Sequence, residues 1–262
     1  MSNPIHRVLI KVYAVGTKAC LALVVLAIFA STTGSAQEKS DDEWQYGLEV
    51  YFWLPNLYVS TDHGNVTLSL KDIITNLRWM TMLDVDARKG KISMGLDVIY
   101  MHLAGSKEGN LRIPPDEPLG KDARVDLKAL IPTFHGGYEV YSKGDVSMDA
   151  IIGVRYLGIK VPIKITVGEM TRRAQPKGHN WDGIVGFNTR KLIDDKSYVD
   201  FYGDIGAGQS DLTWQAKLGF GYQLSKFEAT FGLRYMRWNF KKSANLENLR
   251  ILGPYVGAKW YF

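Results

Sequence analysis

Apolar and polar residues alternate with a period of two through most of the chain after residue 43. In the clearest stretch, every second residue from Leu212 to Leu224 is apolar, and the residues between them are polar or glycine. From Leu252 to Phe262 the same alternation sets a wholly apolar face against a small, aromatic or charged one. Successive side chains of a β-strand point to opposite faces, so this period predicts strands and argues against helices.

The pattern predicts ten strands joined by alternating short and long connections. Residues 89–91 and 142–145 are short turns, whereas residues 104–122 and 158–178 are long loops. Short connections at one end and long ones at the other are expected when consecutive strands run antiparallel. The predicted strands cover residues 44–54, 79–88, 92–102, 124–141, 146–157, 180–190, 198–207, 212–224, 227–239 and 249–262.

Each predicted strand has one apolar face and one face of glycine, charged and aromatic residues. No stretch after Ala36 contains the 18 or so consecutive apolar residues that a membrane helix needs. Lipid outside and a polar interior would produce both features. We therefore predict an all-β fold, a transmembrane antiparallel up-and-down β-barrel of about ten strands. Eight strands result if one has been split, and twelve if a hairpin in residues 57–70 joins the wall.

Two local features are predicted within this frame. A small hairpin around residues 62–65 precedes a short helix at residues 71–77, where Ser69 and Asp72 have the spacing of a capping box. That helix either caps the bore, lies at the membrane interface or belongs to an ordered loop. Pro132 and the pair Gly136-Gly137 interrupt the fourth strand, so a bulge is expected there.

Residues 1–36 have the organisation of a secretory signal peptide. An apolar run from Cys20 to Ala30 is too short to cross a bilayer as a helix, and small residues follow it up to Ala36. Cleavage is expected after Ala36, which leaves a barrel domain of residues 37–262. The alternative is an N-terminal membrane anchor. The segment before the apolar run is basic and has no acidic residue, its charges being Arg7, Lys11 and Lys18.

Charge and cysteine content narrow the function. Loss of the three basic residues of the signal peptide lowers the formal net charge from +5 to +2, so the basic balance is no argument for nucleic-acid binding. Cys20 is the only cysteine and would be removed with the signal peptide. The mature chain would then have no thiol, which excludes disulfides, thiolate metal sites and cysteine nucleophiles.

The end of the chain resembles the last strand of bacterial outer-membrane β-barrel proteins. This resemblance implies that Trp260 and Phe262 form the signal read by the barrel-assembly machinery. Further segments are similar to a family of uncharacterised bacterial outer-membrane β-barrel proteins, and together they cover about two thirds of the mature chain. They include Tyr51-Phe-Trp-Leu-Pro55, Trp181-Asp-Gly, Gly203-Asp-Ile-Gly-Ala-Gly, Asp211-Leu-Thr-Trp214, Gly232-Leu-Arg-Tyr235 and Gly253-Pro-Tyr-Val-Gly257. The resemblance implies the fold and a location in the bacterial outer membrane, but no activity.

The faces predicted to point inward carry both acidic and basic side chains. They either line a polar channel or form a salt-bridged plug, because ten strands leave a bore that side chains can fill. Buried charges need partners, and the first and last strands of a barrel pair, so Glu49 is the expected partner of Lys259. The predicted bore-lining charges are Glu49, Asp97, Asp126, Lys128, Asp149, Arg155, Asp200, Asp204, Lys217, Arg234 and Lys259.

Other chemistry has less support. His102 with Ser106 is the nearest approach to a catalytic pair, but no metal-site or serine-hydrolase motif appears. We therefore predict no enzymatic activity, no metal and no cofactor. The cations of residues 160–177 would contact lipopolysaccharide phosphates if that loop is extracellular, and would be solvated otherwise.

These observations predict an integral outer-membrane protein with a structural role or a narrow pore for small solutes. Its expected partners are outer-membrane lipid, lipopolysaccharide and the barrel-assembly machinery. Two alternatives remain open. One is surface binding or adhesion through the long loops, and the other is a rim enzyme that acts on lipid A or peptides.

Overall fold

The structure is a computed structural model that describes residues 43–61, 64–107, 122–160, 163–167, 170–174, 177–241 and 246–262. The predicted signal peptide, with Cys20 and the cleavage site after Ala36, lies outside these residues. So do His63 and most of the predicted long loop at residues 104–122.

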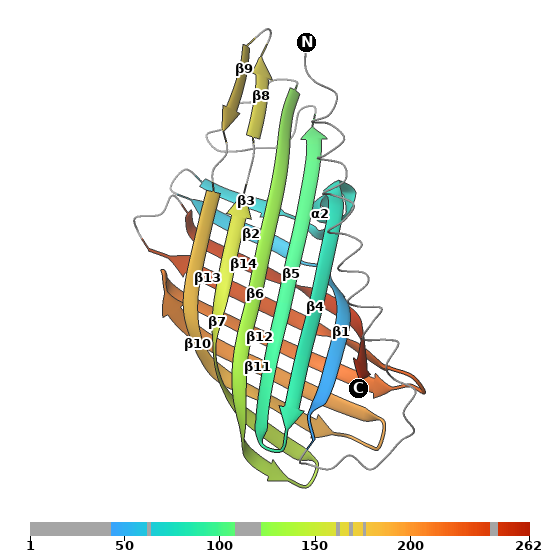
Figure 1. Ribbon diagram of the computed structural model, residues 1–262. Helices are drawn as coiled ribbons and strands as arrows, with labels where there is room; N and C mark the ends of the chain where they lie inside the picture. Colours follow the sequence, from blue (N-terminus) through green and yellow to red (C-terminus); the bar gives the residue numbers. More distant parts are fainter. Residues whose placement is uncertain are drawn as a thin grey trace, which may run out of the picture. The chain divides into compact units, whose positions relative to one another are not determined.

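Ten antiparallel strands form the wall of a barrel: β1 (Gln45–Trp53), β4 (Leu77–Lys89), β5 (Ile92–Lys107), β6 (Asp122–Lys143), β7 (Val146–Lys160), β10 (Lys177–Leu192), β11 (Ser197–Gly208), β12 (Ser210–Gln223), β13 (Glu228–Phe240) and β14 (Leu246–Tyr261). Each strand pairs with the next in this order (Figure 1). β14 pairs back onto β1, with Trp53 opposite Tyr255 and Gly47 opposite Tyr261, which closes the sheet. The predicted ten-stranded closed barrel is confirmed.

Two hairpins extend one end of the barrel (Figure 1). β2 (Asn56–Thr61) follows β1 after a break at Leu54 and Pro55, continues along β14, and turns back as β3 (Gly64–Leu68). This confirms the predicted small hairpin and shows that it does not add two strands to the wall. The region predicted as a loop at residues 158–178 instead contains a second hairpin, which β8 (Ile163–Val167) and β9 (Met170–Ala174) form beside β6.

A short helix, α2 (Leu70–Asn76), connects β3 to β4. The backbone N–H of Asp72 donates to the hydroxyl of Ser69 at 3.3 Å, and the backbone N–H of Ser69 donates to the carboxylate of Asp72 at 3.1 Å. This reciprocal pair is the predicted capping box, and it satisfies two backbone groups that a helix start otherwise leaves unpaired. The helix buries Ile73 against the apolar residues inside the barrel.

Tight turns join strands at the opposite end of the barrel (Figure 1). Gly90 and Gly144 have φ values of 53° and 58°, and each is the first residue of a two-residue hairpin loop. This position requires positive φ in a type II′ turn, whose twist matches that of the flanking strands. In a longer turn, Asp194 accepts the backbone N–H groups of Lys196 and Ser197, both at 2.8 Å. These hydrogen bonds hold the pKa of the exposed Asp194 carboxyl below its usual value.

The outward faces of the strands are apolar and exposed, whereas alternate residues are buried inside. Ile152 on β7 is 69% exposed, and three residues further along the same strand Arg155 is fully buried. On β13, Phe231 is 54% exposed and Arg234 is 2% exposed. A water-soluble barrel would show the reverse arrangement. An apolar exterior around a charged interior is the arrangement of transmembrane barrels.

The interior has two parts, although the sequence predicted a polar bore throughout. Towards the end with the hairpins, inward side chains of the wall form an apolar core that includes Trp53, Met101, Ile131 and Trp238. Towards the end with the tight turns, most inward side chains are polar, charged or aromatic, with Ile151 and Ile184 as buried apolar residues among them. On some strands the apolar part was missed because the outward residues beside it are apolar too, as Phe52 is beside Trp53 and Leu130 is beside Ile131.

The first half of β6 is oriented opposite to the prediction. Ile131 pairs with Ile99 and Ala129 with Met101, and all four side chains are buried. The odd-numbered residues of this segment therefore face inward, although they were predicted to face lipid. The predicted bore-lining residues Asp126 and Lys128 consequently lie at outward positions.

The bulge expected in β6 lies at a different place. Pairing with β5 runs without a register shift through Pro132, Gly136 and Gly137. The irregularity falls between Glu139 and Tyr141, against β7. Pro132 is accommodated because it has no register partner on β7, where its missing N–H would otherwise interrupt the ladder.

Candidate functional site

A continuous bridge of polar side chains crosses the bore. Arg155 on β7 forms an ion pair with Asp204 on β11 and donates to the Gln215 side-chain oxygen at 3.3 Å. The same oxygen accepts a hydrogen bond from Arg234 on β13 at 2.9 Å. Arg234 in turn forms an ion pair with Asp97 on β5, and three strands, β14, β1 and β4, lie between β13 and β5. Gln215 therefore joins two ion pairs into one chain of contacts that links opposite sides of the wall.

Arg234 is held on several sides. Its Nη1 donates to the hydroxyl of Tyr51 at 2.8 Å, and that hydroxyl donates to Asp97 at 2.5 Å. The guanidinium carbon lies 5.2 Å from the ring centroid of Trp53, within the range of a cation–π interaction. This triangle of Arg234, Asp97 and Tyr51 sits directly beneath the apolar core.

Arg155 has a comparable environment. Its Nε donates to the hydroxyl of Thr133 at 3.2 Å, and its Nη1 donates to that of Thr213 at 3.4 Å. The side chains of Arg155 and Asp204 are both fully buried, so the ion pair is removed from water. A buried ion pair is better tolerated when further hydrogen bonds satisfy its members, and Arg155 makes three of them, to Thr133, Thr213 and Gln215.

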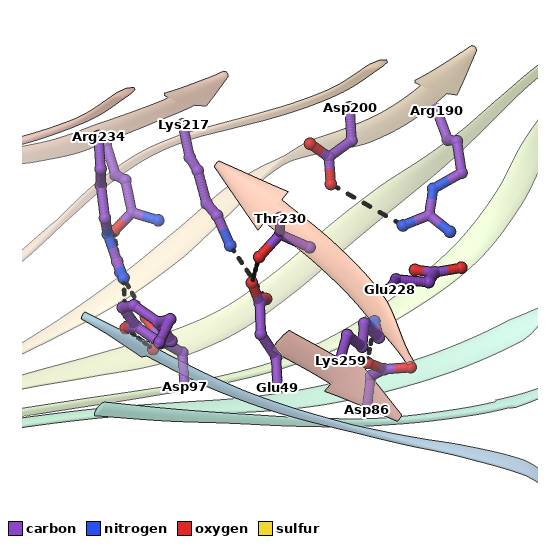
Figure 2. Close-up of polar contacts among 12 residues, drawn as sticks. Glu49, Asp86, Asp97, Arg190, Asp200, Lys217, Glu228, Thr230, Arg234 and Lys259 are labelled. Carbon is purple, nitrogen blue, oxygen red and sulfur yellow. Dashed lines mark hydrogen bonds and ion pairs between the residues drawn. The ribbon is translucent and has the colours of Figure 1, made fainter. Parts of the chain in front are cut away.

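A second layer of charges lies closer to the tight turns. Figure 2 shows Lys217 and Thr230 both directed at Glu49. The Lys217 ammonium lies 3.5 Å from one carboxylate oxygen of Glu49, and the Thr230 hydroxyl donates to the other at 2.5 Å. Lys259 forms its ion pair with Asp86 at 2.5 Å.

The predicted pairing of Glu49 with Lys259 is therefore correct in register and wrong as an ion pair. The two residues are Cα partners on β1 and β14. Glu49 nevertheless pairs with Lys217, which reaches it from β12, and Lys259 pairs with Asp86 of β4. Long cationic side chains inside a narrow barrel can reach across the bore, so the neighbouring strand does not fix the partner.

Ion pairs continue to the end of the barrel. Arg190 lies 3.8 Å from Asp200 and stacks over the ring of Tyr198, with 3.8 Å from its guanidinium carbon to the ring centroid. The Tyr198 hydroxyl donates to Glu228 at 2.7 Å. Arg88 of β4 forms an ion pair with Asp149 of β7.

Inward glycines make room for two tyrosine rings of this network. A Cβ atom at Gly219 would lie 2.4 Å from the hydroxyl of Tyr255, and one at Gly221 would lie 2.1 Å from the Tyr198 ring. Both distances are far below van der Waals contact. Glycine on one strand thus allows a ring from another strand to fill the bore.

The structure brings nine of the eleven predicted bore-lining charges together inside the barrel, each with a partner of opposite charge: Glu49, Asp97, Asp149, Arg155, Asp200, Asp204, Lys217, Arg234 and Lys259. Asp126 and Lys128 lie outside the bore, where their charged groups are 3.9 Å apart. The prediction missed the inward Asp86 and Arg88 as bore charges. Their alternation with Asp84 along β4 was the signal that could have identified them.

His102 also lies on the outer wall, with its Nε2 2.9 Å from a carboxylate oxygen of Asp126. The side chain of Ser106 lies outside the part of the structure that is described. Among the described residues, no group of three or more His, Cys, Asp or Glu side chains is placed to hold a metal ion. In the same part of the chain, no helix is long and apolar enough to cross a membrane.

No protein-family model matches this chain, and no curated protein sequence matches it. Several solved barrels have a similar fold. The outer membrane protease OmpT from Escherichia coli is 8% identical, with 87% of this chain and 100% of that chain covered and a TM-score of 0.43. The translocator domain of autotransporter NalP from Neisseria meningitidis is 10% identical, with 94% and 98% covered and a TM-score of 0.47.

The outer membrane protein OprG from Pseudomonas aeruginosa is 10% identical, with 84% of this chain and 94% of that chain covered and a TM-score of 0.32. These similarities are of fold alone, and no activity is carried over from them. The barrel assignment rests on the strand pairing itself. The predicted outer-membrane-type barrel is confirmed as a fold, and no specific family is indicated.

Proposed function

We propose that the protein is an integral outer-membrane β-barrel with a closed bore, and that its role is structural rather than the passage of solutes. The observation that carries this proposal is the bridge Asp204–Arg155–Gln215–Arg234–Asp97 across the interior. The apolar core above the bridge and the second charged layer below it add two further obstructions. A solute would have to break several buried ion pairs to pass.

The exposed apolar exterior supports insertion in a membrane. Residues such as Leu218, Leu233 and Val256, each at least half exposed, would lie against hydrocarbon. A closed sheet leaves no wall strand without a neighbour, as a lipid environment requires. We propose that the tight turns face the periplasm and that the two hairpins face outward.

The proposal includes export and assembly. The segment of residues 1–36 would direct export and be cleaved near Ala36, and the barrel-assembly machinery would read Trp260 and Phe262. Trp260 packs beside Phe227, with ring centroids 5.9 Å apart. We propose no enzymatic role, because the interior charges are engaged with one another rather than presented to a substrate.

The location is tested by expression of the full chain in a Gram-negative host and separation of the membranes. We expect the processed protein in the outer-membrane fraction, resistant to urea extraction, with faster migration in SDS gels before boiling than after. A soluble periplasmic protein and an inner-membrane protein serve as markers. Recovery of the processed chain in the soluble periplasmic extract would contradict the proposal.

A further inference from the structure

Cationic residues lie side by side on the outer wall near the end with the hairpins. Lys128 on β6 is the register partner of Lys160 on β7, and Lys160 is the register partner of Lys177 on β10. The buried residue Ala129 places Lys128 on the outward face, and Lys160 is exposed. The register thus brings a lysine to the same level of three neighbouring strands.

A second row repeats this arrangement further along β6. Arg124 is the register partner of Lys164 on β8, and Lys164 is the register partner of Arg173 on β9. Arg124 precedes Lys128 by four residues, so both belong to the same face of β6. Together these six positions form what we call the cationic wall: Lys128, Lys160, Lys177, Arg124, Lys164 and Arg173.

Rows of like charge on adjacent strands are unfavourable in a β-sheet. Residues directly opposite each other on adjacent strands have Cβ atoms about 5 Å apart, and like charges at these positions destabilise the pairing. The cationic wall contains four such pairs in succession. Asp126 lies between the two rows on β6, where its carboxylate contacts His102 and Lys128. The negative charge of Asp126 therefore offsets part of the positive charge on β6. In the first row, Lys160 and Lys177 are the cations furthest from Asp126.

The position of the wall relative to the apolar belt indicates what would neutralise it. Along the outward face of β7, Ile152 and Val154 come first, then Tyr156, then Lys160. The Tyr156 ring packs against that of Trp181, with centroids 4.8 Å apart. Aromatic rings at this boundary mark the membrane–water interface. Lys160 lies about 13 Å beyond Tyr156 along the strand, at a rise of about 3.3 Å per residue, which is the level of lipid headgroups.

We propose that the cationic wall binds the phosphate groups of a lipid A-type glycolipid in the outer leaflet. Ammonium and guanidinium groups form charge-assisted hydrogen bonds with phosphate, and an array of them on adjacent strands suits a headgroup with more than one phosphate. The acyl chains of that lipid would lie along the apolar belt below, past Tyr156 and Trp181. This inference rests on the membrane location proposed above, because only that location brings a lipid headgroup to this face.

The test is a titration of the full-length mature barrel in a neutral detergent with bisphosphorylated lipid A, followed by native mass spectrometry. The variant Lys128→Gln/Lys160→Gln/Lys177→Gln removes the first row of cations. A matched control, Lys89→Gln/Lys91→Gln/Lys226→Gln, removes the same charge from exposed positions at the tight turns. We expect the first variant to bind lipid A about 100-fold more weakly than wild type, since each lysine near an anionic surface contributes about fivefold. The control should bind as wild type does.

Two further ligands test whether the protein recognises the phosphate groups of lipid A or phosphate in general. Dephosphorylated lipid A should bind weakly to every form, and millimolar inorganic phosphate should not displace lipid A from wild type. Equal lipid A affinity of the first variant and wild type would overturn the proposal, as would full displacement by inorganic phosphate. The heat-modifiable gel shift verifies that the variants are folded, and the single variant Lys160→Gln, expected to bind about fivefold more weakly, replaces the triple variant if that one fails to fold. Because binding is measured in detergent, its loss is distinct from a failure of the membrane location, which fractionation tests.

Discussion

Replacement of Arg234 by alanine is expected to destabilise the folded barrel by about 3–5 kcal/mol, because it leaves Asp97 as a buried charge without its cation. Arg234 is 2% exposed and contacts Asp97, Tyr51 and Gln215 at once. Its loss therefore removes the centre of the bridge across the bore. The measurement is equilibrium unfolding by urea or guanidinium in phosphatidylcholine vesicles, followed by tryptophan fluorescence.

Two controls make this prediction specific. Lys226→Ala, at an exposed turn, should change the free energy of unfolding by less than about 0.5 kcal/mol. The double variant Arg234→Met/Asp97→Leu removes both charges and should recover most of the loss, since a buried ion pair can be replaced by apolar residues at little cost. An Arg234→Ala barrel with the wild-type unfolding midpoint would show that the bridge is not formed.

Replacement of Phe231 by arginine should destabilise the protein in lipid by about 2–4 kcal/mol. Phe231 projects from the outward face of β13, where its ring packs against that of Phe220 at 5.0 Å between centroids. Arginine there would place a charge in hydrocarbon. In a water-soluble protein the same change at a half-exposed residue would be neutral or beneficial, so the sign of the effect separates the two environments.

The matched control for Phe231→Arg is Leu224→Arg. Leu224 follows β12 at the end with the tight turns and is 40% exposed. Near the interface the cost of an outward arginine falls to about 0–1 kcal/mol. Equal effects of the two substitutions in vesicle-based unfolding experiments would argue against a lipid-facing surface at Phe231.

The barrel could be predicted because its two environments differ so strongly in polarity. Near the tight turns, every inward position of β12 and β13 is polar, glycine or charged, and every outward position is apolar. Alternation with a period of two then identifies the strands and their faces. The helix at residues 70–76 was found by a different signal, the capping box of Ser69 and Asp72.

The orientation of β6 could not be predicted because its two faces do not differ in the expected way. Ala129 and Ile131 face the apolar core, while Leu130 and Phe134 face outward, so apolar residues occupy both sides. Beyond the apolar belt the outward face is free to carry charge. The charges of Asp126 and Lys128 therefore appeared to mark the inside when they mark the outside.

The partners within the ion pairs also could not be predicted from the sequence. Register alone placed Glu49 opposite Lys259, and the structure has that register. The choice of Lys217 for Glu49 and of Asp86 for Lys259 depends on side chains that reach across a bore of a particular width. The width follows from strand number and stagger, which alternation along one strand does not report.

The most direct test of the closed bore is single-channel recording of the purified, refolded wild-type protein in planar lipid bilayers. Because Arg155, Gln215 and Arg234 span the interior beneath an apolar core, we predict no conductance steps above the lipid background at moderate voltage. Folded insertion is verified on the same sample by the heat-modifiable gel shift. Regular, ohmic conductance steps from the inserted wild-type protein would contradict the account.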